Sequence, residues 1–326
     1  MILNSRSGII FLTGNARETG EKAMKDTILE IKNLTKYYGE IRGVENLSLK
    51  LEKGEIFGFI GPNGAGKSTT IRSVMNLINK TEGQVLVEGK EFLRDDTEIK
   101  QIIGYLPSEV NLYDDLTVKG MLDYHESFYK KISEKGSNAT DIHGRRKELV
   151  EVLQLDESKK VEDLSLGNLK KVGIILALMH QPRLLILDEP TSGLDPIMQN
   201  VFYDLLLEEK ERGTTIFYST HILSEVSKIC DRVGIIRGGK LIKVEEVDSL
   251  SDKNLTFVTI RSNQASDIVK ELKVKVVSEE DNYVRFANSI PDDELIKSLS
   301  RYTIDKILIE EATLEDMFLH YYTGEE

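Results

Sequence analysis

A glycine-rich loop between a strand-like run and a helix-like run constrains this chain more than any other feature. The loop reads Gly61-Pro62-Asn63-Gly64-Ala65-Gly66-Lys67-Ser68 and fits the pattern G-x-x-x-x-G-K-[ST]. Residues 56–60 before it are apolar, and from Ile71 to Ile78 apolar residues follow the i, i+3, i+4, i+7 spacing of a helix. Glycines let successive N–H groups turn toward a phosphate, which the helix N-terminus also attracts. The loop predicts a nucleotide site in which Lys67 reaches the β and γ phosphates and Ser68 binds Mg²⁺.

Two adjacent carboxylates follow a second apolar run. Residues 184–187 are typical of a buried strand, and Asp188 and Glu189 come directly after them. At the carboxyl edge of a parallel sheet, Asp188 can hold the Mg²⁺ shell through water while Glu189 orients and polarises an attacking water. Taken alone, the Asp-Glu-Pro sequence is about as typical of a helix N-cap. Together with the phosphate loop it favours a hydrolytic site.

Strand-like and helix-like segments alternate from Thr27 onward, which predicts an α/β fold with a parallel sheet. Strands are expected at residues 28–31, 41–51, 56–60, 84–88, 184–187 and 214–219, and helices at 117–155 with a polar break at 133–141, from Gly167 onward, and at 199–211. Two apolar runs around Gly238-Gly239 predict a closing hairpin. We therefore expect one domain over residues 27–248 with a helical insert at about 110–180.

The two ends of the chain differ from this pattern. Four strand-like runs, at residues 255–260, 274–277, 283–287 and 304–309, are separated by two helical stretches and predict a small α+β domain over residues 249–326. Residues 1–26 are expected to be an N-terminal extension, a leader or a stretch upstream of the true start, because the strand-like pattern begins only at Thr27.

Charge and cysteine content exclude several classes of protein. The chain has 43 Lys+Arg against 55 Asp+Glu, a formal net charge of −12, so no nucleic-acid partner is expected. The single cysteine, Cys230, excludes an internal disulfide and a cysteine-built zinc site and favours a reducing compartment. The longest uninterrupted apolar stretch in the middle of the chain, residues 174–179, is far shorter than the ~18–20 residues that span a bilayer.

Four further motifs stand in order around the loop and the carboxylates. They are Tyr38 before a glycine, Leu164-Ser165-Leu166-Gly167-Asn168, Ser192-Gly193-Leu194-Asp195-Pro196, and Ser219-Thr220-His221. With the phosphate loop and the carboxylates, residues 27–245 resemble the nucleotide-binding subunit of ATP-binding cassette (ABC) transporters. In that family the four motifs are the aromatic that stacks on adenine, the signature, the D-loop and the switch histidine. Taken alone, a tyrosine or histidine at such a position is more typical of a structural or surface residue.

The resemblance implies a P-loop NTPase fold of the ABC type and a role for each matching residue. Glu189, His221 and Lys67 would be catalytic, Ser68 and Asp188 would hold Mg²⁺, and ATP would contact Tyr38, the loop residues Gly61, Pro62, Asn63, Gly64, Ala65, Gly66, Lys67 and Ser68, and Thr69. Ser165, Leu166, Gly167 and Asn168 would face the nucleotide of a second subunit, with Asp195 in the D-loop and Ser108 in the Q-loop position. Two ATP molecules would lie between two subunits, either in a homodimer or with a second ABC ATPase subunit.

Five positions depart from the family pattern. Leu166 replaces the first signature glycine, Asn168 replaces its glutamine, and Ser108 stands where a glutamine is usual. A side chain at 166 restricts close backbone approach, and the side chains of Asn168 and Ser108 have a shorter reach than glutamine. Lys170-Lys171 also stand where Gln-Arg is usual. These changes bear on the rate of turnover and on the symmetry of the two sites.

The resemblance implies an ATP-hydrolysing subunit that dimerises on ATP at the cytoplasmic face of the cell membrane and powers export through a separately encoded integral membrane permease. The segment between Ser108 and Tyr129 would form the permease groove, and residues 312–321 resemble the tail of exporter ATPase subunits. One alternative is a low-turnover ATP switch or regulatory subunit, motivated by Leu166, Asn168 and Ser108. Another is a non-transport ABC ATPase acting on DNA or ribosomes, against which the acidic balance and the single cassette argue.

Overall fold

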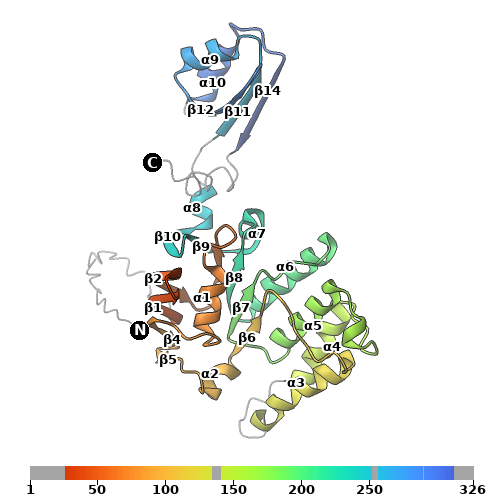
Figure 1. Cartoon of the computed structure of the whole chain (residues 1–326). Helices are drawn as coiled ribbons and strands as arrows, with labels where there is room; N and C mark the ends of the chain where they lie inside the picture. Colours follow the sequence, from red (N-terminus) through yellow and green to blue (C-terminus); the bar gives the residue numbers. More distant parts are fainter. Residues whose placement is uncertain (1–25, 134–140, 252–255, 289, 312–326) are drawn as a thin grey trace, which may run out of the picture.

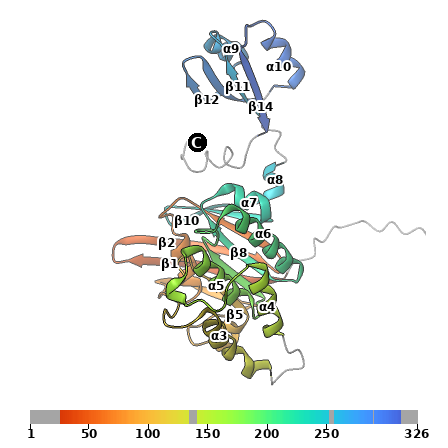
Figure 2. The same cartoon turned by 90° about the vertical axis from the view of Figure 1, so that its right-hand side faces the viewer.

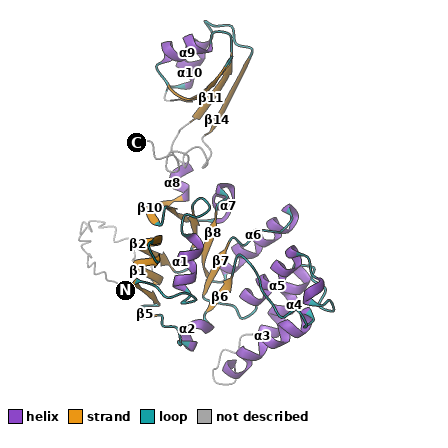
Figure 3. Cartoon of the chain, viewed as in Figure 1, coloured by secondary structure: helices purple, strands orange, loops and turns teal. Residues whose placement is uncertain are grey.

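A computed structural model describes residues 26–133, 141–251, 256–288 and 290–311 (Figure 1). The proposed N-terminal extension, apart from residue 26, and the tail at 312–321 lie outside the described residues. The described part contains three sheets and the helices that cover them (Figure 3).

A six-stranded sheet is the centre of the fold. Its strand order is β10-β9-β3-β8-β7-β6, in which five neighbouring strands are parallel and β10 pairs antiparallel with β9. The strands are β3 (Ile56–Ile60), β6 (Ile103–Leu106), β7 (Leu184–Asp188), β8 (Thr215–Thr220), β9 (Arg232–Arg237) and β10 (Lys240–Glu246). Every residue of β3, β7 and β8 is buried, because both faces of the sheet are covered. The parallel α/β core and the hairpin at Gly238-Gly239 are confirmed.

A smaller antiparallel sheet packs beside the central one, in the order β2-β1-β4-β5. Its strands are β1 (Thr27–Tyr38), β2 (Ile41–Glu52), β4 (Glu82–Val87) and β5 (Lys90–Glu91). Helix α1 (Lys67–Val74) contacts β1, β2 and β7, so it lies between the two sheets. Buried Leu29, Phe59 and Ile71 belong to the hydrophobic cluster that joins these elements. This packing fixes the start of α1, and with it the phosphate loop, relative to the end of β7.

The remaining helices of this part cover the other face and the β6 edge of the central sheet (Figure 2). They are α2 (Thr97–Gln101), α3 (Val118–Ser133), α4 (Ile142–Val152), a 3-10 turn (Val161–Asp163), α5 (Leu166–Leu178), α6 (Pro196–Glu211), α7 (Leu223–Ile229) and α8 (Val247–Ser251). No helix within the described ranges is long and apolar enough to cross a bilayer.

The third sheet has its own core. It is antiparallel, in the order β12-β13-β11-β14, and two helices pack on it. The elements are β11 (Thr256–Arg261), α9 (Ala265–Leu272), β12 (Lys275–Glu280), β13 (Tyr283–Asn288), α10 (Asp292–Leu299) and β14 (Lys306–Glu311). The order of strands and helices agrees with the α+β pattern expected from the sequence.

One predicted element is shorter than expected. The apolar spacing extended the helix after the phosphate loop to Ile78, but α1 ends at Val74 with Met75 as its C-cap. Asn76 then takes a left-handed backbone with φ of 54° and turns the chain away. Ile71 and Val74 lie in the core, whereas Met75 only packs against its edge.

Candidate nucleotide site

The phosphate loop wraps around the side chain of its own lysine. Lys67 is 6% exposed, and its Nζ donates to the carbonyl oxygens of Gly61 at 2.7 Å and Pro62 at 3.4 Å. Gly66 is the N-cap of α1 with φ of 109°, a conformation that favours glycine. A methyl group on Gly61 would lie 2.3 Å from the carbonyl oxygen of Ile236. Glycine is therefore required where the loop crosses β9.

Asp188 joins the loop to two strands. Its Oδ1 accepts hydrogen bonds from Ser68 Oγ at 3.2 Å and Ser219 Oγ at 2.8 Å, while the buried Oδ2 has no hydrogen-bond partner. A hydroxyl and a carboxylate oxygen directed to the same place suit Mg²⁺, which takes one or two protein ligands together with phosphate oxygens and water. Within the described ranges no group of three or more His, Cys, Asp or Glu side chains forms a closed metal site.

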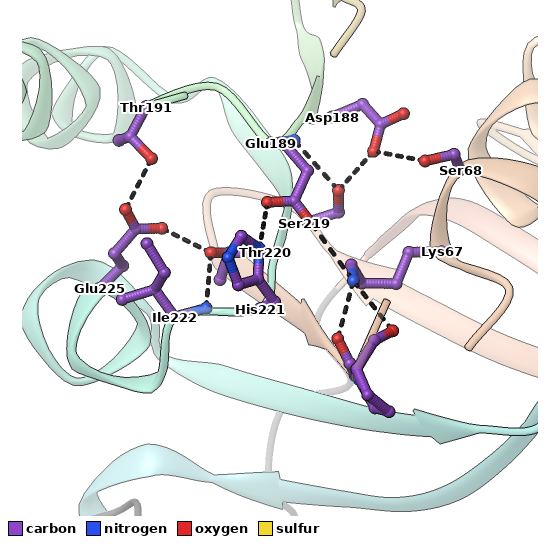
Figure 4. A network of polar contacts seen from close by, with 12 residues as sticks. Lys67, Ser68, Asp188, Glu189, Thr191, Ser219, Thr220, His221, Ile222 and Glu225 are labelled. Atoms are coloured by element: carbon purple, nitrogen blue, oxygen red, sulfur yellow. Dashed lines mark hydrogen bonds and ion pairs between the residues drawn. The ribbon is translucent and has the colours of Figure 1, made fainter. Parts of the chain in front are cut away.

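Glu189 is held by both its backbone and its side chain (Figure 4). Its backbone is left-handed, with φ of 48°, and its N–H donates to the carbonyl oxygen of Ser219 at 3.1 Å. One carboxylate oxygen lies 3.2 Å from Lys67 Nζ, and the other lies 2.6 Å from His221 Nδ1. The structure thus brings together the three side chains that the sequence marked as catalytic.

A cleft of about 440 Å³ opens over these groups. Its lining consists of Asn63, Gly64, Ala65, Gly66, Lys67, Ser68, Thr69, Ser108, Glu109, Glu189, Ser192 and His221. Ser108, from the loop after β6, therefore faces the same space as the phosphate loop. Beside the cleft, burial and the Asp188 charge raise the pKa of Tyr105 to about 12, so this phenol stays neutral.

Tyr38 lies at the loop end of β1. A methyl group on Gly43 would touch both Tyr38 at 3.0 Å and Thr69 at 2.9 Å, so the tyrosine ring and the start of α1 flank the same glycine. The ring is 47% exposed, and Lys36 Nζ lies 4.9 Å from its centroid. A half-exposed ring next to the phosphate loop is available for a flat ligand.

The predicted signature residues and Asp195 do not line the cleft. Ser165 caps α5 and accepts from the backbone N–H of Asn168 at 3.4 Å, and Leu166 is 66% exposed. A methyl group on Gly167 would lie 2.8 Å from the carbonyl oxygen of Gly193, so the signature touches the D-loop. Asp195 caps α6 through the N–H groups of residues 197 and 198 at 3.1 Å and 3.0 Å. Within one chain, these residues are not among those that line the cleft.

The sequence reasoning missed one buried acid. Glu225, on α7, is 3% exposed and accepts hydrogen bonds from four hydroxyl groups. The donors are Thr191 at 2.6 Å, Tyr203 at 3.1 Å, Tyr218 at 2.9 Å and Thr220 at 2.6 Å. Burial, followed by the Glu225 charge, raises the pKa of Tyr218 and keeps its hydroxyl proton in place. Glu225 joins the segment after Glu189 to the strand end before His221.

It also missed the position of Lys170, which it noted only as a departure from the usual Gln-Arg. Lys170 is 2% exposed, and its ammonium lies between the loop of Ser108 and the backbone of Glu189. Burial lowers its pKa, while the charges of Asp188 and Glu189 act in the opposite direction. No signal in the linear sequence marks it, because its partners lie 62 and 19 residues away along the chain.

Comparison with known proteins agrees with this geometry. Residues 44–192 match the family model described as ABC transporter. The bacitracin transport ATP-binding protein BcrA of Bacillus licheniformis is 37% identical over 312 residues, covering 91% of this chain and 98% of that protein. The linearmycin resistance ATP-binding protein LnrL of Bacillus subtilis is 32% identical, covering 90% of this chain and 97% of that protein.

Solved structures lead to the same family. A bacterial ABC transporter cassette solved as a dimer superposes with a TM-score of 0.60 at 27% identity, covering 68% of this chain and 99% of that one. The ATP-binding subunit of another ABC transporter has a TM-score of 0.61 at 26% identity, covering 84% and 100% of the two chains. The chain therefore belongs to the ABC transporter family, as an ATP-binding subunit that hydrolyses ATP.

Proposed function

We propose that this subunit hydrolyses ATP in a dimer at the cytoplasmic face of the cell membrane and powers export through a separate integral membrane permease. The observation that carries the catalytic part is the meeting of Lys67, Glu189 and His221 in one cleft. Export is supported by the relatives named for bacitracin transport and linearmycin resistance, which match over nearly their whole length. The exported substrate is a property of the permease.

ATP binding is assigned to the loop and its lysine. Residues 64–69 line the cleft, and N–H groups at the start of a helix such as α1 favour the β and γ phosphates. Lys67, now held by two carbonyl oxygens and Glu189, is in position to donate to the same phosphates. Tyr38 supplies the face on which adenine stacks.

The residues around Asp188 are assigned to Mg²⁺. Ser68 Oγ and Asp188 Oδ1, which lie 3.2 Å apart, fit its preference for oxygen ligands. When bound, Mg²⁺ supplies positive charge that stabilises the transferring phosphoryl group. Ser219 donates to the same oxygen of Asp188 and so keeps the carboxylate oriented.

Glu189 is assigned as the group that orients and polarises the attacking water, and His221 as a γ-phosphate contact. The imidazole lies 2.6 Å from the Glu189 carboxylate, so it can hold that carboxylate while a phosphate oxygen approaches its other nitrogen. A proton taken from water by Glu189 would be the general-base step of the hydrolysis.

The signature is assigned to the nucleotide of a second subunit. Ser165 and Leu166 are exposed and do not line the cleft of their own chain, so they are available to meet another copy or a related subunit. The N–H groups at the start of α5 give that surface a partial positive charge suited to a γ-phosphate. The bulk of Leu166 is the observation that favours the low-turnover alternative.

The permease surface is assigned to the segment between Ser108 and Tyr129. Here Tyr113, Tyr124 and Phe128 are about half exposed, and their rings meet edge to face with centroids 5.7 Å and 5.0 Å apart. Exposed aromatic rings of this kind are typical of protein contacts. Exchanging Tyr124 and Phe128 for serine should release the chain from native membranes without changing the ATPase activity of the purified protein.

The deciding experiment is ATPase activity of purified protein as a function of its concentration. We expect specific activity to rise with concentration, because two chains form each site, and to be lost in Glu189→Gln. Glu109→Gln removes a carboxylate from the same cleft wall and should keep activity within about threefold. A wild-type rate equal to that of Glu189→Gln at every concentration would contradict the self-sufficient homodimer and favour a heterodimer or a switch.

A further inference from the structure

Lys170 lies where three segments of the molecule meet. It is one turn into α5, and its side chain is 2% exposed. The ammonium donates to the carbonyl oxygens of Ser108 at 2.7 Å, Pro107 at 3.3 Å and Glu189 at 3.4 Å. An ammonium has three N–H donors, and here three backbone carbonyls satisfy them. One buried cation therefore joins the signature helix, the Q-loop position and the proposed catalytic glutamate.

The contact with Glu189 falls on a strained piece of backbone. A left-handed conformation is unfavourable for a residue with a side chain and persists only where the surroundings impose it. The N–H of Glu189 donates to the carbonyl oxygen of Ser219, and its C=O accepts from the backbone N–H of Ser192 at 3.3 Å and from Lys170 at 3.4 Å. These contacts hold the peptide groups on both sides of the Glu189 Cα and so set the direction in which its side chain leaves the backbone, and Lys170 is the contact that ties this segment to the loop at Pro107 and Ser108.

The contact with the 107–108 loop gives this arrangement a second role. Ser108 lines the nucleotide cleft, and the same loop leads into the segment assigned to the permease. Lys170 contacts its backbone and not the Ser108 side chain, so the link does not depend on the missing glutamine. If the loop at Pro107 and Ser108 moves, the Ser108 carbonyl moves with it. That carbonyl and the Glu189 carbonyl both bind the Lys170 ammonium, so the movement also affects Glu189.

We propose that Lys170 is a positioning residue for ATP hydrolysis, which sets the backbone of Glu189 and links it to the loop at Pro107 and Ser108. This inference rests on the assignment of Glu189 as the water-polarising group. Lys170 contacts neither nucleotide nor water in this role. It acts only through the two backbone segments that it holds.

The kinetic test compares Lys170→Met with Lys171→Met in the full chain. Methionine keeps most of the buried volume of lysine but removes the charge and the donors. We expect Lys170→Met to lower kcat about 10²-fold, because the carboxylate is misplaced, while the Kd for ATP changes less than threefold. Lys171→Met, one residue along and partly exposed, should leave both values unchanged. Lys170→Arg restores a cation with donors and should recover about tenfold of the lost rate.

The structural test needs no turnover, so it also decides the proposal for a protein that hydrolyses ATP slowly. In hydrogen–deuterium exchange of the nucleotide-free chain, Lys170→Met should speed exchange at both 107–110 and 189–192. Lys171→Met should leave both segments as in the wild type. Unchanged exchange at 189–192 in a folded Lys170→Met protein would overturn the proposal, as would unchanged kcat in an active one.

Failure of the assigned chemistry gives a different result. If Glu189→Gln keeps its activity, the assignment of Glu189 is wrong whatever Lys170 does. If Glu189→Gln is inactive and Lys170→Met is fully active with native exchange, only the positioning role of Lys170 fails. A Lys170→Met protein that does not fold is replaced by Lys170→Gln, which keeps two N–H donors, and the same two measurements decide.

Discussion

The ammonium of Lys67 lies 3.2 Å from a carboxylate oxygen of Glu189, across the space assigned to the γ-phosphate. The two side chains are 6% and 19% exposed, so water screens the pair only partly. A phosphate that binds to Lys67 must therefore compete with Glu189 for the same cation.

Neutralising Glu189 should consequently strengthen nucleotide binding while it abolishes turnover. We expect Glu189→Gln to bind ATP about fivefold more tightly than the wild type, because ATP binding then no longer has to break the ion pair between Lys67 and residue 189. Equilibrium binding of a fluorescent ATP analogue to both proteins measures the difference. Glu109→Gln is the control for simple removal of negative charge from the cleft, and an equal gain there would show that the Lys67 contact is irrelevant.

The buried carboxylate of Glu225 should be important for stability out of proportion to its size. Glu225→Ala leaves four hydroxyls without an acceptor, and we expect it to lower the free energy of unfolding by about 3 kcal/mol. Tyr203→Phe removes one donor and leaves the carboxylate three, so about 1 kcal/mol is expected. Urea denaturation measures the free energy of unfolding of both variants. If Glu225→Ala and Tyr203→Phe lose similar amounts, the four hydrogen bonds do not stabilise the fold as one network.

Acid should weaken the protein through His180. Burial lowers its pKa to about 4, and its ring stacks on Tyr129 with centroids 4.5 Å apart. Because the unfolded chain takes up this proton near the ordinary pKa of 6.5, stability is complete above that value and falls as pH drops toward 4. Neighbouring His125, whose pKa burial also lowers, adds to the same trend.

The measurable quantity is the loss of unfolding free energy between pH 7 and pH 5. We expect His180→Gln, which cannot be protonated, to lose about 2 kcal/mol less over this interval than the wild type. Identical slopes for the two proteins would contradict the prediction.

The signature departure at Leu166 should limit the approach of the second subunit. Leu166 is 66% exposed, so Leu166→Gly should change stability by no more than about 1 kcal/mol. We expect it to raise ATP-dependent dimerisation and specific ATPase activity severalfold, because the backbone there can come closer to a phosphate. Analytical ultracentrifugation of variants that also carry Glu189→Gln measures the dimer. Ile197→Gly trims another exposed apolar residue nearby, and the same gain there would point to unspecific loss of bulk.

The parts of the fold that followed from sequence are those in which one residue pattern has one structural solution. The loop before Lys67, the apolar run before Asp188 and the turn at Gly238-Gly239 are of this kind. The short strand β6 was missed because it has only four residues and one of them is a glycine. The structure explains that glycine: a Cβ at Gly104 would collide with the carbonyl oxygen of Ala177. The end of α1 was missed because the apolar spacing continues past Asn76, whereas the helix does not.

The site shows a similar division. The residues that we assign to the ligand belong to recognisable motifs, so Lys67, Asp188 and His221 could be proposed from the sequence. Glu225 and Lys170 could not, because a glutamate or a lysine on a helix is usually solvated, and only the tertiary structure reveals what each one holds. Hydrogen bonding to groups distant in sequence is the information that a linear pattern lacks.

Because Glu189 has a left-handed backbone, the residue that suits catalysis at this position is not the residue that suits thermal stability. Glycine there would relieve the strain and should give a more heat-resistant protein that is catalytically inert. Selection for thermal tolerance alone would therefore favour inactive variants at residue 189. Selection that also requires transport would have to obtain added stability from substitutions elsewhere in the chain.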